Sequence, residues 1–514
     1  MVAIRTTPRG QRGARRRTPL WRAAPVHPPL AASVSSPVVT VAVDGPAPVM
    51  VGATSSPDQD NRRLGDYARR VQHAFEAIEP TLRRIAALSQ DADFVRRAQH
   101  EAHARLGFEL PVSVLERAWI GGLDMRALFA YASFATVRAL SDDYFLNDPL
   151  GMGGRAAAFE RFLLECGFHA MNLTPCSDGR LAHVIGYVLR LPMGVVRRKA
   201  HAGALFDVEE AVRRWTETEL RRHREGLPNT ADAPTRYLKV AVYHHSSRDP
   251  AHQGCAAHGS DDARAAAAGL AQLRAFREAI ENSYCCGASI DILLIGVDTD
   301  TDRIRIHLPD AAGEPALERY LDSGSLHAEI RGLGTQAVRD HIRAAVSAAG
   351  GANPPTAGMQ RLVARLIEHN LEQLDYVRAE HGGQYPDAGH QERFIGVGGD
   401  LAEVQLRNLT FFAFMRTLEE GAADLDIGVD IFRRLNLARG LPIPVVVRFD
   451  YPGRVPGARA RAVERCTRVA EAIARRYPEL AAQGLLHTWS TVRDSDHGGR
   501  IEGVGGSLSE WEGL

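Results

Sequence analysis

Lysine is almost absent from this chain. Of the 62 basic residues, only Lys199 and Lys239 are lysine, and the others are all arginine. The 62 acidic residues balance them, so the formal net charge is zero and does not favour nucleic acid or a membrane surface. No apolar run approaches the ~20 residues of a membrane-spanning helix. We therefore expect neither nucleic acid nor a membrane as a partner.

Cysteine is also scarce, with six residues scattered along 514 positions. Their number and spacing show no disulfide framework. This indicates a reducing compartment in which the thiols are free or bound to metal. The remaining composition is ordinary for a globular protein, and the length predicts about three domains.

The first 150 residues divide into two predicted segments. Residues 1–57 are rich in arginine and proline and hold a single acid, Asp44. They predict a disordered basic arm that either stays solvated or binds an acidic partner surface. The amphipathic helix of a transit peptide is absent from this arm. Residues 58–150 place apolar side chains three and four positions apart, which predicts a helical domain.

The rest of the chain predicts two α/β domains. In residues 151–397, the continuous apolar run 290–297 is typical of a strand buried on both faces. Residues 398–514 show the same order of strand, loop and long helix, with Phe449–Asp450 standing where His244–His245 stand earlier. We expect an α+β or α/β multi-domain protein whose second α/β domain is a copy without metal. In 151–397 we predict strands at 168–174, 236–244, 288–297 and 303–308, and helices at 180–190, 208–224 and 261–283. In 398–514 we predict a strand at 441–450 and a helix near 457–476.

Three residues with metal-binding side chains follow predicted strands. Cys176 follows the first strand, His244 ends the second, and Cys255 lies in the turn-rich stretch beyond it. Thiolate and neutral imidazole are good zinc ligands, and three protein ligands leave the fourth tetrahedral position open for catalysis. We therefore predict one Zn²⁺ per chain. This reasoning leaves three other histidines open as the imidazole ligand: His245, His252 and His258.

Asp178 and Arg180 lie two residues apart, directly after Cys176. They can form a bidentate ion pair, in which Arg180 keeps Asp178 ionised and aimed at water on the metal. A helix beginning near Leu181 would place its N-terminus beside the Cys176 thiolate. The alternative is a capping aspartate, an ordinary arginine and a buried cysteine, because short motifs often match by chance. We predict Asp178 and Arg180 as catalytic residues.

Two further motifs allow more than one interpretation. Cys285–Cys286 precede a buried strand and are predicted as packed core thiols, with a ligand or a vicinal disulfide as the alternatives. Asp298–Asp302 is similar to a calcium loop. However, Arg303 and Pro309 occupy the places of the required glycine and glutamate, which excludes an EF-hand. We predict a solvated turn there.

Taken together, these motifs resemble those of carbonic anhydrases. The order Cys-x-Asp-x-Arg, then a strand ending in His, then Cys, resembles that of the β-type enzymes. In those enzymes the two Cys and the His bind zinc, and the Asp–Arg pair orients water. Lys199–Gly203 is similar to another segment of that family. Pro175–Arg180, Tyr243–Ser246 and Cys285–Asp302 resemble hallmarks of the carboxysomal carbonic anhydrases, and this resemblance covers about residues 60–514.

The resemblance implies a helical domain, a β-carbonic-anhydrase-like α/β zinc domain and a defunct copy of it. It implies Cys176, His244 and Cys255 as ligands and Asp178 and Arg180 as the catalytic pair. The implied activity is reversible hydration of CO₂ to bicarbonate, which supplies CO₂ to Rubisco inside the carboxysome, a bacterial cytoplasmic microcompartment. It also implies a homodimer or higher homo-oligomer, and we expect the arm to contact Rubisco or the carboxysome shell.

Two other functions remain as alternatives. The first is a non-catalytic structural zinc protein that tethers Rubisco or the shell, which a fourth protein ligand such as His252 would support. The second is a zinc amidohydrolase or deaminase. A deaminase requires the spacing Pro-Cys-x-x-Cys, and the second cysteine of that spacing is missing after Pro175–Cys176.

Overall fold

The computed structural model describes residues 56–508, except for 151–154, 193–195, 284–288 and the single positions 228, 231, 233, 400, 402, 404 and 416. Nearly all of the predicted arm, and the pair Cys285–Cys286, lie outside the described residues. None of the described helices is long and apolar enough to cross a membrane.

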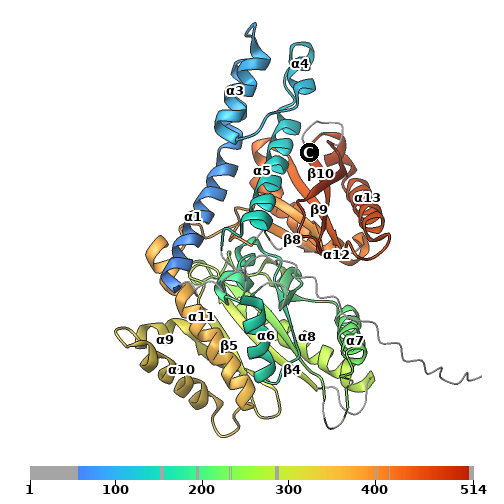
Figure 1. Cartoon of the computed structure of the whole chain (residues 1–514). Coiled ribbons are helices and arrows are strands. Elements are labelled where there is room, and N and C mark those ends of the chain that lie inside the picture. Colours follow the sequence, from blue (N-terminus) through green and yellow to red (C-terminus); the bar gives the residue numbers. More distant parts are fainter. Residues whose placement is uncertain are drawn as a thin grey trace, which may run out of the picture. The chain divides into compact units, whose positions relative to one another are not determined.

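The N-terminal region is helical, as predicted (Figure 1). Leu64, Val71 and Phe75 form a buried stripe on the first helix, because residues three or four apart share one helix face. Ser56 caps this helix by accepting a hydrogen bond from the main chain of Gln59. The five helices are α1 (Pro57–Glu76), α2 (Ile78–Ala87), α3 (Phe94–Leu106), α4 (Val112–Gly121) and α5 (Met125–Asn147).

The central region is built on a six-stranded mixed sheet with strand order β2-β1-β3-β4-β5-β6. The first four of these strands pair in parallel, and β5 and β6 are antiparallel to their neighbours. The four predicted strands correspond to β1, β3, β4 and β5 within two residues. The strands are β1 (Ala170–Pro175), β2 (Val196–Arg198), β3 (Arg236–His245), β4 (Ser289–Asp298), β5 (Ile304–Pro309) and β6 (Pro315–Asp322).

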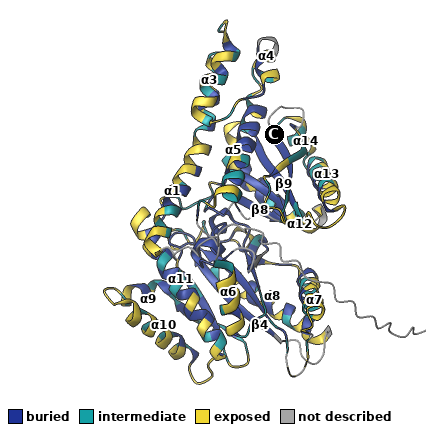
Figure 2. Cartoon of the chain, viewed as in Figure 1, coloured by how far each residue is buried: buried dark blue, intermediate teal, exposed yellow. Residues whose placement is uncertain are grey.

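Helices cover this sheet. In Figure 2 the strands are buried and the outer sides of the helices are exposed. Helix α8 packs on β3 and β4, the two central strands, and covers one face of them. The helices are α6 (Arg155–Glu165), α7 (Val208–Arg224), α8 (Asp262–Ser283), α9 (Ser323–Glu329), α10 (Thr335–Gly350) and α11 (Ala357–His381).

The segment after β1 differs from the prediction of a helix over 180–190. It forms a 3₁₀ turn, η1 (Gly179–Leu181), and a short π-helical turn, η2 (Val184–Val188). All residues from 176 to 192 are buried. In this buried segment, polar groups bond to distant parts of the chain. One example is the main-chain N–H of Gly179, which donates to Glu392.

The prediction of a solvated turn at Asp298–Asp302 is wrong, because all five residues are buried. Asp298 accepts a hydrogen bond from the main-chain N–H of Asp300 at 3.1 Å, and Asp302 accepts one from the hydroxyl of Tyr385 at 2.7 Å. Segments distant in sequence therefore cover these carboxylates and replace the water that the composition suggested.

The C-terminal region holds a second, five-stranded sheet with order β11-β10-β9-β7-β8, parallel except for β11. The predicted strand and helix of this region correspond to β9 and α13. The predicted domain boundaries at 150 and 397 stay predictions. The elements are β7 (Phe394–Gly398), β8 (Thr410–Phe414), α12 (Leu418–Leu435), η5 (Leu437–Arg439), β9 (Ile443–Tyr451), α13 (Ala458–Arg476), α14 (Pro478–Ala482), β10 (Leu486–Asp494) and β11 (Glu502–Gly506).

Candidate metal centre

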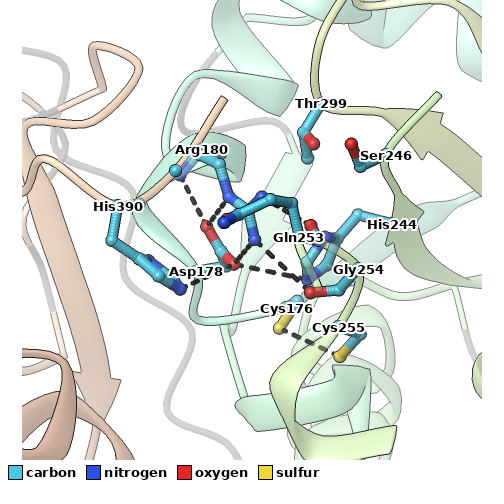
Figure 3. A network of polar contacts seen from close by, with 12 residues as sticks. Cys176, Asp178, Arg180, His244, Ser246, Gln253, Gly254, Cys255, Thr299 and His390 are labelled. Atoms are coloured by element: carbon cyan, nitrogen blue, oxygen red, sulfur yellow. Dashed lines mark hydrogen bonds and ion pairs between the residues drawn. The ribbon is translucent and has the colours of Figure 1, made fainter. Parts of the chain in front are cut away.

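Cys176, His244 and Cys255 meet at the carboxyl ends of β1 and β3 (Figure 3). The parallel register pairs Pro175 with Val242, so the two strands deliver their next residues to the same edge of the sheet. The ligand atoms of the three side chains all lie within 4.8 Å of one another. The two sulfur atoms are 4.0 Å apart.

This donor set fits a bound dication. The His244 side chain is buried, and neither of its ring nitrogens has a hydrogen-bond partner among the described residues. The contact with Cys255 and burial raise the pKa of Cys176 well above its usual range, and the same contact lowers the pKa of Cys255. A bound metal would displace the protons of the two thiols. Thiolates and imidazole together suit zinc.

Of the four histidines that the sequence left open, only His244 joins this cluster in the described structure. His245 follows it on the same strand, so its side chain faces the opposite side of the sheet. The His252 side chain is 77% exposed. His258 points its Nε2 atom at the carbonyl oxygen of Gly203, 3.2 Å away.

The predicted pair of Asp178 and Arg180 is present and bidentate. Arg180 donates from Nε to Oδ1 at 3.0 Å and from Nη2 to Oδ2 at 2.6 Å. Arg180 also donates to the main-chain oxygens of Gln253 at 2.6 Å and Ala388 at 3.2 Å. Burial alone would raise the pKa of Asp178, but the charges of Arg180 and His390 outweigh it and hold that pKa well below its usual range. Asp178 is thus a fixed, ionised hydrogen-bond acceptor.

Gly203 contributes a contact to the cluster through its main chain. Its N–H donates to Sγ of Cys176 at 3.2 Å. Gly203 has φ +66°, and a Cβ there would lie 2.6 Å from Nε2 of His258, so only glycine fits. The neighbouring Ala202 N–H donates to Asp424 of α12 at 3.0 Å. The amide that supports Cys176 therefore comes from the 199–203 segment, and not from the N-terminus of the helix that the sequence predicted near Leu181.

Sequence reasoning missed His390 and Glu392. His390 Nε2 lies 3.9 Å from Oδ2 of Asp178, and its Nδ1 bonds to Glu392 at 2.9 Å. Burial lowers the pKa of His390, but the charges of Asp178 and Glu392 outweigh it and raise that pKa. These three side chains also lie close enough to hold a cation, but both oxygens of Asp178 already face Arg180, which opposes a second cation. Both residues follow α11 and lie far from Asp178 in the sequence. No short motif therefore connects them with the Asp–Arg pair.

Three family models match almost the whole described chain. The model described as carboxysome shell carbonic anhydrase, N-terminal, matches residues 56–145. The catalytic-domain model of the same family matches 158–390, and its C-terminal model matches 391–508. The metal-ligand cluster, the Asp–Arg pair and His390 all fall within the span of the catalytic-domain model.

Several relatives carry the same description. A carboxysome shell carbonic anhydrase of Prochlorococcus marinus (strain MIT 9313) is 56% identical over 87% of this chain and 88% of its own length. One from Parasynechococcus marenigrum (strain WH8102) is 55% identical over 87% of this chain and 78% of its own. One from Halothiobacillus neapolitanus is 44% identical over 86% of this chain and 88% of its own. The similarity thus covers all three regions of the fold.

Proposed function

The chain belongs to the carboxysome shell carbonic anhydrase family, and on that premise we propose that it hydrates CO₂ reversibly to bicarbonate at a zinc ion held by Cys176, His244 and Cys255. The observation that carries this proposal is the cluster of two thiols and a buried imidazole beside a buried Asp–Arg pair. Membership confirms the predicted enzyme class and the predicted carboxysome location.

Bound zinc would supply the Lewis acidity that makes water a nucleophile near neutral pH. The chain's own residues orient that water. Ionised Asp178 can only accept a hydrogen bond, and its Oδ2 lies 3.5 Å from Nε2 of His244, at the edge of the cluster. Arg180 holds both carboxylate oxygens and is itself anchored to two main-chain oxygens. The acceptor is therefore preorganised before substrate arrives.

The ligands are supported by their surroundings. The N–H of Gly203 donates to the sulfur of Cys176, which reduces the charge that this thiolate places on the metal. His244 and Cys176 are almost fully buried, so bulk water does not compete for them. The cluster holds three ligand side chains among the described residues, which favours a catalytic site over a closed structural site.

Hydration of CO₂ releases one proton for each bicarbonate formed, and His390 in its neutral form is the group that we assign to receive it. Its side chain is 16% exposed, whereas those of Asp178 and Arg180 are 5% and 0% exposed. His390 therefore connects the buried pair with solvent. Glu392 fixes the orientation of the imidazole ring by accepting from Nδ1, which leaves Nε2 facing Asp178.

The C-terminal sheet is proposed as a copy of the catalytic sheet that lacks a metal. In both sheets a parallel central strand leads through a loop to a long helix, β3 to α8 and β9 to α13. Where β3 ends in His244–His245, β9 ends in Phe449–Asp450 and Tyr451. Such side chains do not form a zinc site, so the proposal expects one zinc per chain.

The proposed setting follows from the relatives, which are named as shell proteins. We expect the activity to supply CO₂ to Rubisco, the arm of residues 1–57 to contact Rubisco or the shell, and the chain to form a homodimer or higher homo-oligomer. The alternative, a structural zinc tether, has no specific contact in its favour, because His252 lies outside the cluster.

The test is stopped-flow CO₂ hydration on purified protein, with metal analysis of the same sample. The proposal expects one zinc per chain and turnover that the variant Cys176→Ala abolishes together with the zinc. Full turnover in the zinc-free variant would contradict the proposal, and zinc without turnover in the wild type would favour the structural tether.

A further inference from the structure

Asn408, at the start of the C-terminal sheet, contacts two loops of the candidate site. We call residues 177–181 the dyad loop and residues 385–390 the histidine loop. The main-chain N–H of Asn408 donates to the carbonyl oxygen of Gly179, in the dyad loop, at 2.8 Å. Its side-chain amide donates to the carbonyl oxygen of Gly389, in the histidine loop, at 3.2 Å. A single residue thus bridges the two loops.

The conformation of Asn408 suits this bridge. Its φ is +57°, in the left-handed region that asparagine tolerates better than most other residues. The residue is 8% exposed. Its amide carries two hydrogens in one plane, and besides Gly389 it reaches the carboxylate of Asp387. An aspartate at this position would offer no donor and would place two carboxylates together.

A second bridge runs parallel to the first. Glu392 accepts from the main-chain N–H of Gly179 at 3.0 Å and from Nδ1 of His390 at 2.9 Å. The N–H of Gly179 is therefore bound by Glu392, and its carbonyl oxygen by Asn408. A Cβ on Gly179 would lie 2.4 Å from Glu392, which shows how closely the loops approach. Glu392 and Asn408 therefore both connect the dyad loop, at Gly179, with the segment that carries His390.

Arg407, which precedes Asn408 in the sequence, also binds the histidine loop. It donates to the main-chain oxygen of Asp387 at 2.9 Å and to that of Thr299 at 3.0 Å. Its guanidinium lies 4.2 Å from the centre of the Tyr385 ring. The histidine loop is therefore held as a unit, and Asn408 links this unit to the dyad loop in addition to the bond from Arg180 to the carbonyl oxygen of Ala388.

We propose that Asn408 is a positioning residue, which holds His390 at its working distance from the Asp178–Arg180 pair. By this assignment the C-terminal sheet contributes to turnover although it does not touch the substrate. The inference rests on the function proposed above. It expects a loss in kcat, because placement of the proton-receiving group affects turnover, with zinc content and KM unchanged.

The principal variant is Asn408→Gly. Glycine keeps the left-handed backbone and its N–H bond to Gly179, and it deletes the side-chain amide that bonds to Gly389 and Asp387. We expect kcat to fall about 10- to 100-fold at low buffer concentration, the cost of a small misplacement near a reacting group. Added imidazole should restore the rate, since a diffusing base replaces a misplaced one. Asn353→Gly is the matched control, because Asn353 is exposed and uses only its carbonyl oxygen in a hydrogen bond.

Asn408→Asp is the second variant, equal in size but without donors, and it should show the same loss and the same rescue. A crystal structure of Asn408→Gly provides a readout independent of activity. Nε2 of His390 lies 3.9 Å from Oδ2 of Asp178 in the native chain. In the variant this distance should be longer, or the His390 ring should be disordered.

Wild-type kcat in both variants, with His390→Gln impaired, would overturn this inference and leave the proposed function standing. Loss of zinc together with activity, without rescue by imidazole, would also overturn it, because that pattern indicates a purely structural role. A wild-type holoenzyme that does not hydrate CO₂ would contradict the proposed function, and this inference would fall with it.

Discussion

Nε2 of His390 lies 3.9 Å from Oδ2 of Asp178. Asp178 belongs to the turn after β1 and His390 to the loop before β7, so the contact joins segments far apart in the chain. A buried carboxylate thus faces an imidazole that reaches solvent. This contact connects the metal-ligand cluster with the surface.

Cys255→Ser should reduce the zinc content far below one per chain and bring CO₂ hydration to background. A serine hydroxyl stays protonated at neutral pH and is a poor zinc ligand beside one thiolate and one imidazole. Metal analysis after dialysis against a chelator measures the effect. Cys466→Ser is the control, because Cys466 is buried outside the cluster and its Sγ bonds to Thr491 at 3.3 Å, a bond that serine can also form. Equal zinc loss in both variants would count against the assigned ligand.

Arg180→Lys should keep the zinc and lower kcat roughly 100-fold, the scale for removing one preorganised donor from an active site. Lysine cannot bind both oxygens of Asp178 at once, so the carboxylate loses its fixed orientation. Steady-state CO₂ hydration and metal analysis on one sample separate the two effects. The control is Arg236→Lys, because Arg236 forms a similar bidentate pair with Asp291 outside the cluster. Unchanged kcat in Arg180→Lys would rule out the proposed role of the pair.

His390→Gln should lower kcat about 100-fold at low buffer concentration, the lower end of the range for a positioned proton-transfer group. KM should stay the same, and imidazole should restore the rate, because glutamine retains hydrogen bonding but cannot carry the proton. The measurement is the dependence of kcat on buffer concentration. His252→Gln, at a 77% exposed side chain, is the matched control. A loss that buffer does not repair would exclude proton transfer as the function of His390.

Asp302→Asn should reduce the free energy of unfolding at pH 7 by about 3 kcal/mol, the upper end of the scale for hydrogen bonds to a buried charged group. Burial opposes ionisation of Asp302, but the charge of His183 and hydrogen bonds from His183, Gln373 and Tyr385 outweigh it and lower its pKa. Since the folded pKa lies below the unfolded value of about 3.9, this stability is present above about pH 4. It is lost as the pH falls through the folded pKa.

Urea unfolding between pH 3 and pH 7 measures this contribution. The native chain should lose stability more steeply in acid than Asp302→Asn, because the variant has no carboxylate to protonate at that position. Asp375→Asn is the control, since the Asp375 side chain is 60% exposed. Parallel curves for the native chain and Asp302→Asn would show that the buried carboxylate does not stabilise the fold in this way.

The local pattern of the chain determined the helical N-terminal region, five of the strands, three of the long helices in the α/β regions and the side chains that gather at the metal-ligand cluster. Cys176 and His244 are recognisable because each stands at the end of an apolar strand, and strand ends meet at one edge of a parallel sheet. Asp178 and Arg180 are two residues apart, so their pairing needs no distant contact. The sequence could not rank His244 above its neighbours, because that choice depends on which face of β3 meets Cys255.

Only the tertiary structure decided what surrounds these residues. His390, Glu392 and Asn408 reach the site from segments after α11, and no spacing in the sequence signals such contacts. The same reason explains the error at Asp298–Asp302, where five polar residues predict a solvated turn. Composition describes the chemistry that a segment carries, whereas burial depends on which distant segments cover it, as Tyr385 covers Asp302.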